Sequence, residues 1–269
     1  MEQTLSIIGA GKVGRVLGHQ FYKHQIFTLG DVLNRSVKSG LAACKFIGAG
    51  NPITDYAELQ PADVFMLAVP DDQIKTCSLR LQEQGLVKSA TIVFHCSGAL
   101  SAGELGLARG AASVHPLRSF ADPADVAHHF IATICTLEGD SYATQHLTPA
   151  LQKIGAEVVA IHPEGKTLYH AASVFASNYL VTLMDASLRT FEAAGISPEM
   201  ALRMTKPLAH ESFNNVFRLG SQQALTGPIA RGDVETIKRH QSALTKWDGD
   251  MEALYTALAK STQNMKDRD

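Results

Sequence analysis

The segment SVHPLRSF, residues 113–120, contains side chains that could move a proton and bind an anion. An unperturbed histidine titrates near neutral pH, so His115 could supply the proton that a carbonyl oxygen gains when a hydride reduces the carbonyl carbon. Pro116 restricts the chain that leaves this histidine, and Arg118 offers a guanidinium beside it for an anionic substrate. We therefore predict that His115 is the proton carrier and that Arg118 binds substrate.

A second polar group recurs along residues 166–194, a stretch without Gly or Pro. Lys166, His170, Ser173 and Ser177 are spaced four, three and four residues apart, which places them within about 60° on one side of a helix. The rest of the stretch is largely apolar, so we expect it to be buried, where polar groups need partners or a cavity. We predict that the four residues line a cleft, with Lys166 and His170 in the catalytic set and Ser173 and Ser177 contacting substrate. An internal hydrogen-bond ladder is the alternative.

Two further polar residues follow segments that end strands or turns. Ser97 comes directly after the apolar run in ATIVFHCSG, and we place it in the catalytic set, although a structural role is equally compatible with its position. Arg231 follows the turn in ALTGPIARGD and could bind a substrate anion, with an ordinary surface loop as the alternative. The eleven histidines include no H-x-x-x-H spacing, so we expect no metal site.

The first residues contain the pattern G-x-G-x-x-G between an apolar run, LSIIG, and a helix-compatible segment. In this setting Gly9 permits a tight turn, Gly11 lets the backbone approach a pyrophosphate, and Gly14 lets the helix pack closely on the strand. The pyrophosphate would lie at the helix N-terminus. The predicted cofactor-binding residues of this loop are Gly9, Gly11, Lys12, Val13 and Gly14.

The end of the next apolar run distinguishes the two nicotinamide cofactors. An NAD site usually has an acidic residue there, whereas this chain has Asn34, Arg35 and Ser36, which could hold the 2′-phosphate of NADP. We predict NADP (NADPH); in the alternative, Asp31 binds the ribose and Arg35 is a solvated loop residue. Val69 and Pro70, which end the run DVFMLAVP, should lie near the nicotinamide ribose.

Seven short apolar runs must position these groups. They are closed by Gly, Pro or Asn and alternate with helical stretches, which indicates a parallel sheet covered on both faces. The runs are LSIIG, TLGDVLN, DVFMLAVP, ATIVFHCSG, AASVHP, FIATICTLEG and AEVVAI. No strand pattern follows residue 162. We therefore predict an α/β protein with a doubly wound Rossmann domain over residues 1–162 and an all-helical substrate and dimerisation domain over residues 163–269.

The composition excludes several classes of partner. The net charge of −2 gives no indication of nucleic acid or an acidic membrane surface, and no apolar run is long enough to span a bilayer. The four cysteines are widely spaced, as expected for reduced thiols in a cytoplasmic protein. The first long helix of the second half is apolar nearly all round, so we expect a homodimer that acts on a small-molecule substrate.

The motifs GAGKVG, NRS, HPLRSF, YHAASVFASNYLVTL and ALTGPIARGD together resemble the Rossmann-like family whose C-terminal half is domain of unknown function 2520. That family is similar in plan to pyrroline-5-carboxylate reductases, 6-phosphogluconate and 3-hydroxyisobutyrate dehydrogenases, ketopantoate reductases and prephenate dehydrogenases. The resemblance implies NADP-dependent oxidoreduction, a helical dimerisation domain of the 6-phosphogluconate dehydrogenase type and a site between the domains.

Three residues gain a possible role from this resemblance. Lys166 occupies the helix-start place of the lysine in 3-hydroxyisobutyrate-type enzymes, whereas His170 stands where those enzymes have Asn. His115-Pro116 resembles the His-Pro of prephenate dehydrogenases, whose histidine engages the substrate hydroxyl. We expect an NADP-dependent oxidoreductase acting on a small anionic carbonyl or hydroxy-acid compound such as ketopantoate. The alternatives are a non-catalytic NADP-binding sensor and a deazaflavin-dependent NADP reductase.

Overall fold

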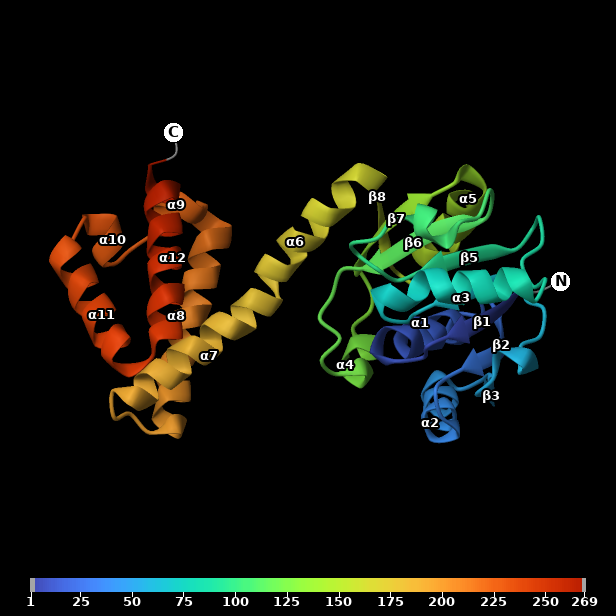
Figure 1. The fold of residues 1–269 in the computed structure, drawn as a ribbon, viewed down its shortest axis with the longest axis horizontal. Helices are drawn as coiled ribbons and strands as arrows, with labels where there is room; N and C mark the ends of the chain where they lie inside the picture. The colour runs from blue at the N-terminus through green and yellow to red at the C-terminus, as the bar shows by residue number, and fades with distance from the viewer. Residues whose placement is uncertain (1–2, 268–269) are drawn as a thin grey trace. The chain divides into compact units, whose positions relative to one another are not determined.

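The computed structural model describes residues 3–267 and divides into two compact units, one ending at Ser177 and the other beginning at Asn178 (Figure 1). The first unit contains the sheet and the second is entirely helical among its described residues. The α/β architecture with a helical C-terminal part is the predicted fold. Among the described residues, no helix combines the length and the apolar character that crossing a membrane requires.

The sheet has eight strands in the order β3-β2-β1-β4-β5-β6-β7-β8. Neighbouring strands are parallel except β6 and β7, which are antiparallel, so β7 and β8 run against the other six. All seven predicted runs form strands, and the sequence pattern missed only the three-residue β3. The strands are β1 Thr4–Ile8, β2 Thr28–Leu33, β3 Asn51–Ile53, β4 Val64–Leu67, β5 Ile92–His95, β6 Ala111–Pro116, β7 Ile134–Gly139 and β8 Glu157–Ala160.

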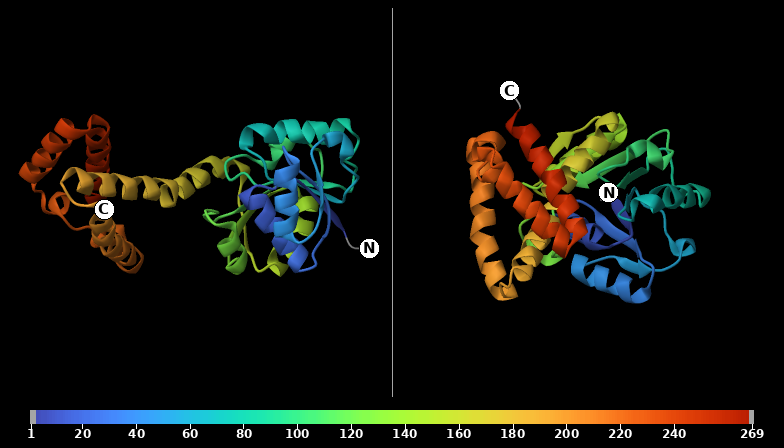
Figure 2. Two further views of the ribbon diagram at one scale, coloured as in Figure 1. Left: turned by 90° about the horizontal axis from the view of Figure 1, so that it is seen from below. Right: turned by 60° about the vertical axis from the view of Figure 1, so that its left-hand side comes forward.

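Helices cover both faces of this sheet (Figure 2), which explains why its strands are apolar at successive positions. In β4, Val64 and Met66 join a core cluster with α1, α2, α4 and α5, whereas Phe65 and Leu67 join a second cluster with α3. The helices of this unit are α1 Lys12–Lys23, α2 Val37–Ile47, α3 Asp71–Glu83, α4 Pro123–His128, α5 Ser141–Lys153 and α6 Lys166–Ala176. Three short 3-10 helices, η1 Tyr56–Glu58, η2 Ala102–Leu105 and η3 Pro163–Gly165, complete it.

The stretch predicted as one helix from residue 166 to 194 is two helices, and that prediction is wrong at its middle. Ser177 leaves helical geometry with φ −126° and ψ −72°, and it separates α6 from α7. The expectation that the apolar residues are buried is also wrong for α6, because Leu168 is 78% and Phe175 69% exposed, whereas Lys166 is only 1% exposed. The polar side of α6 faces the polar carboxyl ends of strands rather than the apolar core.

The second unit consists of helices, two of which begin at the capping residues Ser197 and Asp233. Ser197 accepts a hydrogen bond from the Met200 amide at the start of α8, and Asp233 does the same for the Thr236 amide at the start of α11. The helices are α7 Asn178–Ala193, α8 Pro198–Leu219, α9 Ser221–Ala224, α10 Pro228–Arg231, α11 Val234–Trp247 and α12 Gly249–Lys266.

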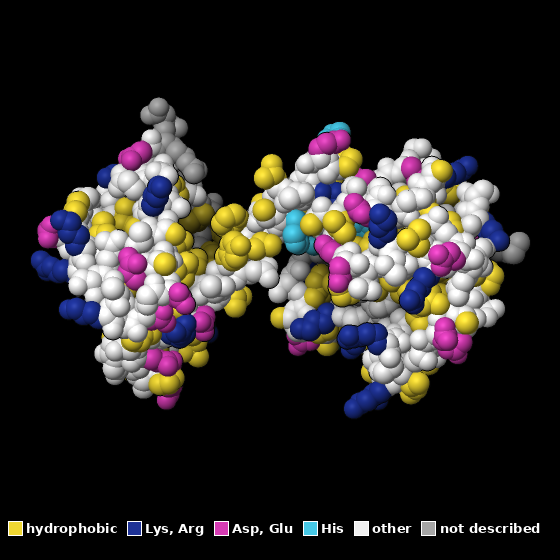
Figure 3. All heavy atoms as spheres, in the orientation of Figure 1, with side chains coloured by type: hydrophobic (Ala, Val, Ile, Leu, Met, Phe, Trp, Pro, Cys, Tyr) yellow, Lys and Arg dark blue, Asp and Glu magenta, His cyan; other side chains and the backbone are white. Residues whose placement is uncertain are grey.

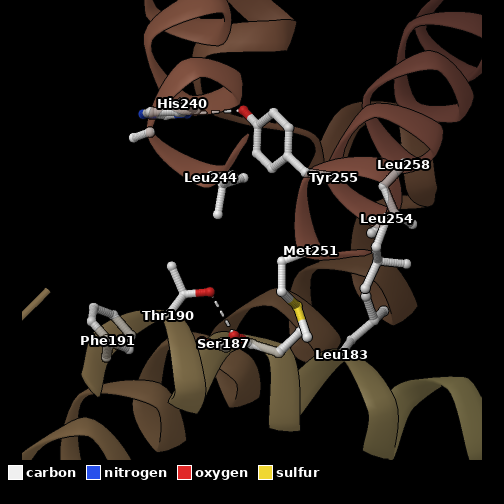
Figure 4. A pocket seen from close by; sticks show the side chains of 12 residues that line it. Leu183, Ser187, Thr190, Phe191, His240, Leu244, Met251, Leu254, Tyr255 and Leu258 are labelled. Atoms are coloured by element: carbon white, nitrogen blue, oxygen red, sulfur yellow. Dashed lines mark hydrogen bonds between the residues drawn. The ribbon is translucent and has the colours of Figure 1, made fainter. Parts of the chain in front are cut away.

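A mainly apolar cavity of about 410 Å³ lies between α7, α11 and α12 (Figure 4). Its polar rim includes His240 Nδ1 and the Tyr255 hydroxyl, which share a hydrogen bond of 2.9 Å. The remaining lining residues are Leu183, Ala186, Ser187, Thr190, Phe191, Ala243, Leu244, Met251, Leu254 and Leu258.

Candidate functional site

A cavity of about 1000 Å³ opens at the carboxyl ends of β1, β2 and β4, where an open α/β sheet binds its ligands. Six of the predicted cofactor-binding residues line it: Gly9, Gly11, Asn34, Arg35, Val69 and Pro70. The other lining residues are Ile8, Ala10, Arg15, Leu33, Ser39, Thr54, Asp55, Tyr56, Ala68, Asp72, Gln73, Thr76, Cys77 and Arg80.

The three glycines of the first loop have the geometry that their predicted roles require. Gly9 has φ +85°, and a Cβ there would lie 2.6 Å from a methyl group of Val69. Gly11 has no atom within 4 Å of such a Cβ, so its backbone is open to the cavity. A Cβ at Gly14 would lie 2.8 Å from the Gly9 carbonyl oxygen, which is the close contact between helix and loop that glycine allows. The loop therefore fits a diphosphate against bare backbone.

Four predicted cofactor residues lie beside this cavity rather than on its lining. Lys12 Nζ donates to the Ala121 carbonyl, and Val13 packs against the core. Ser36 caps α2 by accepting from the Ser39 amide. With Gly14, these residues shape the loop and the two helix starts.

The end of β2 has no carboxylate available for a ribose. Asp31 is 4% exposed, and its two oxygens accept hydrogen bonds from Asn51 Nδ2 at 2.9 Å and the Gln60 amide at 2.7 Å. Asn34 is fixed as well, because its Oδ1 accepts from the Ala10 amide at 2.7 Å. Arg35 is left as the cationic group at this strand end that lines the cavity.

The part of the cavity formed by η1 and α3 was not predicted from the sequence. The Arg80 guanidinium lies 4.9 Å from the Tyr56 ring centre, a distance typical of a cation–π contact. Burial raises the pKa of Tyr56 well above its usual range, so its hydroxyl stays protonated. Asp72, Thr76 and Arg80 are four residues apart on α3, and this spacing is the signal that could have placed them on one helix side.

A second group of polar side chains lies where β5 and β6 end and α6 begins. His115 Nδ1 lies 2.8 Å from the Tyr169 hydroxyl, and the rings of His115 and His170 are 5.8 Å apart at 82°. A Cβ at Gly98 would come within 2.7 Å of His170 Nδ1 and 2.9 Å of His115 Cε1. The absence of a side chain at Gly98 is therefore what allows both histidines to approach this loop.

His115 is held in its neutral form. Burial lowers the pKa of His115 to about 4, and the neighbouring His170 and Lys166 add to this effect while Asp71 opposes it. Near pH 7 the ring can therefore accept a proton or donate the one it carries in a hydrogen bond. His95 cannot take the same role of proton carrier, because both of its ring nitrogens are engaged within the chain. Its Nε2 lies 3.0 Å from the Ser101 carbonyl, and its Nδ1 accepts a hydrogen bond from the Ser97 amide.

Lys166 is an internal residue of this site. Its Nζ donates to Ser113 Oγ at 2.7 Å and approaches the Ser97 carbonyl at 3.4 Å. Burial lowers the pKa of Lys166, while Glu138 and Asp71 act in the opposite direction. These bonds attach α6 to the ends of β5 and β6, as in the hydrogen-bond ladder that the sequence analysis kept as an alternative.

Ser97 also has its hydrogen bonds filled within the chain. Its hydroxyl donates to Asp71 Oδ2 at 2.8 Å and accepts from the amides of Ala99 and Leu100. The bond to Asp71 connects the start of α3, which borders the large cavity, to the loop beside His115. Asp71 and Tyr169 are members of this site that the sequence analysis did not select, although Tyr169 lies three residues after Lys166 on the same helix.

The four predicted substrate-binding residues are dispersed. The Arg118 guanidinium donates to the His129 carbonyl and to Thr133 Oγ1. Ser173 Oγ donates to the Tyr169 carbonyl within α6, and Ser177 ends that helix. Arg231 ends α10 in the helical unit. The structure thus brings together His115, His170, Lys166 and Ser97, and within residues 3–267 it contains no group of three or more residues suited to a metal ion.

Two family descriptions match this chain, and they meet within the sheet rather than at Ser177. The description "Rossmann-like domain" matches residues 2–115, and "Domain of unknown function (DUF2520)" matches residues 133–262. The two descriptions match successive segments of the chain. A search of curated proteins finds no match.

Solved structures share this fold over nearly the whole chain. Protein TM1727 from Thermotoga maritima is 26% identical with a TM-score of 0.72, and the match covers 98% of this chain and 100% of that one. The proposed NADP oxidoreductase BF3122 from Bacteroides fragilis is 20% identical with a TM-score of 0.79, covering 98% of each chain. Pyrroline carboxylate reductase from Plasmodium falciparum, solved with NADP bound, is 14% identical with a TM-score of 0.60 over 98% of each chain.

Proposed function

We propose that this protein is an NADP-dependent oxidoreductase that interconverts a small carbonyl compound and the corresponding hydroxy compound. The observation that carries the proposal is a neutral, partly buried histidine at the carboxyl end of β6, on the same edge of the sheet as a cavity formed by a glycine-rich loop. Structural neighbours described as NADP oxidoreductases support the same reaction class.

The residues that line the cavity support the choice of a dinucleotide with a 2′-phosphate. Gly9 and Gly11 leave bare backbone at the N-terminus of α1, which suits a diphosphate. Arg35 lines the cavity where the ribose would lie. The two carboxylate oxygens of Asp31 accept hydrogen bonds from Asn51 and Gln60 instead of facing the cavity. A guanidinium at a strand end whose own carboxylate, Asp31, is already hydrogen-bonded favours NADP over NAD.

His115 would carry the proton of the reaction. A bound nicotinamide supplies a hydride to a carbonyl carbon or accepts one from a hydroxy carbon. In the oxidising direction the neutral ring accepts the hydroxyl proton; in the reducing direction its N–H donates to the carbonyl oxygen. The ring packs closely against Gly98, and Lys166 fixes α6 against the strand that presents the histidine.

The deciding experiment is a turnover screen in both directions. NADPH oxidation is followed with 2-keto acids, imino acids and aldehydes, ketopantoate included, and NADP⁺ reduction is followed with the matching hydroxy acids. We expect turnover with at least one carbonyl and its hydroxy partner, with preference for anionic compounds. Tight NADPH binding without turnover across the whole panel would instead support a non-catalytic NADP-binding protein.

The role of His115 is tested by replacing it. His115→Ala should lower kcat by at least about 10²-fold and leave NADPH affinity unchanged, because the ring donates to the substrate and not to the cofactor. His170→Ala is the matched variant, since that ring is 5.8 Å away. A large loss of kcat only in His170→Ala would assign the role of proton carrier to His170. No loss of kcat in either variant would refute a histidine as the proton carrier.

A further inference from the structure

The partner of His115 on α6 is a tyrosine hydroxyl. His115 Nδ1 and the Tyr169 oxygen are 2.8 Å apart, and the two rings meet edge to face at 86°. A partly buried imidazole whose Nδ1 is bound to a phenol can present only its other nitrogen, Nε2, to a substrate. The direction of this hydrogen bond therefore decides whether Nε2 carries a proton.

The direction follows from a threonine on the neighbouring strand. Thr136 lies directly opposite His115 in the β6–β7 pair, and its buried Oγ1 has no hydrogen-bond partner among the described residues. Burial raises the pKa of Tyr169, and the nearby hydroxyls of Thr136 and Ser173 act in the opposite direction. The Ser173 hydroxyl already donates to the Tyr169 carbonyl, which leaves Thr136. A buried hydroxyl must use its proton, and the Tyr169 oxygen is the nearby acceptor. The tyrosine then donates its own proton to His115 Nδ1, and the histidine carries its proton on Nε2.

We propose that Tyr169 is a positioning residue that fixes the Nε2–H tautomer of His115 and replaces the proton that His115 gives to the substrate. This inference rests on the proposed oxidoreductase function. As hydride reaches the carbonyl carbon, the new alkoxide oxygen takes the Nε2 proton, Nδ1 takes the phenolic proton, and the histidine ends neutral. After the product leaves, water protonates Nε2 and the phenolate takes the Nδ1 proton back, which restores the Nε2–H tautomer. The whole sequence runs backwards when a hydroxy compound is oxidised.

The surroundings of the pair favour this transfer. An alkoxide is a far stronger base than a phenolate, so the proton moves downhill. Burial raises the pKa of Tyr169, which keeps the phenol protonated and able to donate near pH 7. The other ionisable groups that act on His115 are His170 and Lys166 from α6, which disfavour an imidazolium, and Asp71 from α3, which favours one.

Tyr169→Phe removes the hydroxyl and keeps the ring. For the best substrate of the screen, we expect kcat for reduction to fall by about 10- to 100-fold, with KM and NADPH affinity changed less than about threefold. The wild-type kcat should be flat between about pH 6 and 8. In the variant it should fall about tenfold per pH unit, because only an imidazolium could then donate and return to neutral. Tyr142→Phe is the control, since that hydroxyl bonds to the Ala90 carbonyl.

A second measurement needs no substrate. Long-range ¹H–¹⁵N spectra of histidine-labelled protein distinguish the two neutral tautomers. We expect His115 to be the Nε2–H tautomer in the wild type and in Tyr142→Phe, and a mixture of tautomers in Tyr169→Phe. An Nδ1–H tautomer in the wild type, or an unchanged tautomer and pH profile in Tyr169→Phe, would overturn the inference. Failure of the proposed function is a separate result, namely no turnover by the wild type.

Discussion

At the scale of single residues, hydrogen bonds decide which charged groups can meet a ligand. Asp31 has the residue type and approximate place of a ribose-binding carboxylate, but both of its oxygens are occupied inside the chain. Lys166 has the type of a substrate-binding cation, yet it is 1% exposed and bonded to Ser113. Such pairing is invisible in a sequence, because each partner lies twenty or more residues away.

Arg35 should determine the choice of cofactor. We expect NADPH to bind more tightly than NADH, and Arg35→Ala to remove most of that difference, because a charge-assisted contact contributes about 1.5–3 kcal/mol, or roughly 10- to 150-fold. Fluorescence titration with both nucleotides measures this. Lys45→Ala removes a cation from α2 outside the cavity lining and should change neither affinity. Equal affinities in the wild type, or a preference for NADH, would contradict the prediction.

The partly buried His115 should make stability depend on pH. Its pKa of about 4 in the folded chain lies below its ordinary value of 6.5. Between these pH values the unfolded chain binds a proton that the folded chain does not, so the free energy of unfolding rises with pH across this window. The contribution is roughly 3 kcal/mol at most, present above about pH 6.5 and lost as the pH falls towards 4.

Urea unfolding at pH 5 and pH 7 tests this directly. His115→Gln should reduce the difference between the two pH values, although His95, whose pKa burial also lowers, contributes in the same direction. His24→Gln alters an exposed histidine and should leave the difference as in the wild type. The prediction fails if His115→Gln and His24→Gln give the same pH dependence.

At the scale of elements, the strands were predictable and α6 was only partly so. Continuous apolar runs closed by Gly, Pro or Asn identify strands buried on two faces, whereas β3 has three residues, Asn-Pro-Ile, and no such pattern. The polar spacing that begins at Lys166 did identify the side of α6 that faces the site. The burial of its apolar side could not be judged, because the sequence does not show that α6 meets polar strand ends. The break between α6 and α7 at Ser177 could not be predicted, because no Gly or Pro lies near it in the sequence.

The loop after β5 should tolerate no side chain at Gly98. Gly98→Ala places a methyl group 2.7 Å from His170 Nδ1 and 2.9 Å from His115 Cε1, so one or both rings must move. We expect kcat to fall by about 10-fold or more, with NADPH affinity unchanged. Gly165→Ala is the matched control, because a Cβ there has no atom within 4 Å. Similar kcat in both variants would contradict the prediction, because it would show that the loop can accept a methyl group at residue 98 without displacing the histidines.

At the scale of the whole molecule, α8 exposes more apolar surface than a solvated helix needs. Leu202, Phe213 and Phe217 are 59%, 38% and 86% exposed and fall within about 60° on one side of the helix. Apolar side chains are visible over the helical unit in Figure 3. We propose that this side of α8 is covered by a second copy of the chain in a homodimer.

Sedimentation velocity at micromolar concentration tests this proposal. We expect the wild type to sediment as a dimer of the 28.9 kDa chain and Phe217→Glu to sediment as a monomer. Ile131→Glu, which places the same charge at a 77% exposed position of the first unit, should remain dimeric. A monomeric wild type would refute the homodimer, and a dimeric Phe217→Glu variant would refute the role of this side of α8.

The antiparallel pairing of β6 with β7 has a consequence for recombination. The Rossmann-like match ends at residue 115 and the DUF2520 match begins at residue 133, so the boundary between the two matched segments lies between two hydrogen-bonded strands of one sheet. A chimera joined there would replace β7 and β8 while keeping β6. The native pairing of β6 with β7 would be lost, and each half would have an unpaired edge strand. A crossover at Ser177 avoids this loss. Replacing the helical unit after that residue would leave the glycine loop, His115 and α6, which contains Tyr169, unchanged.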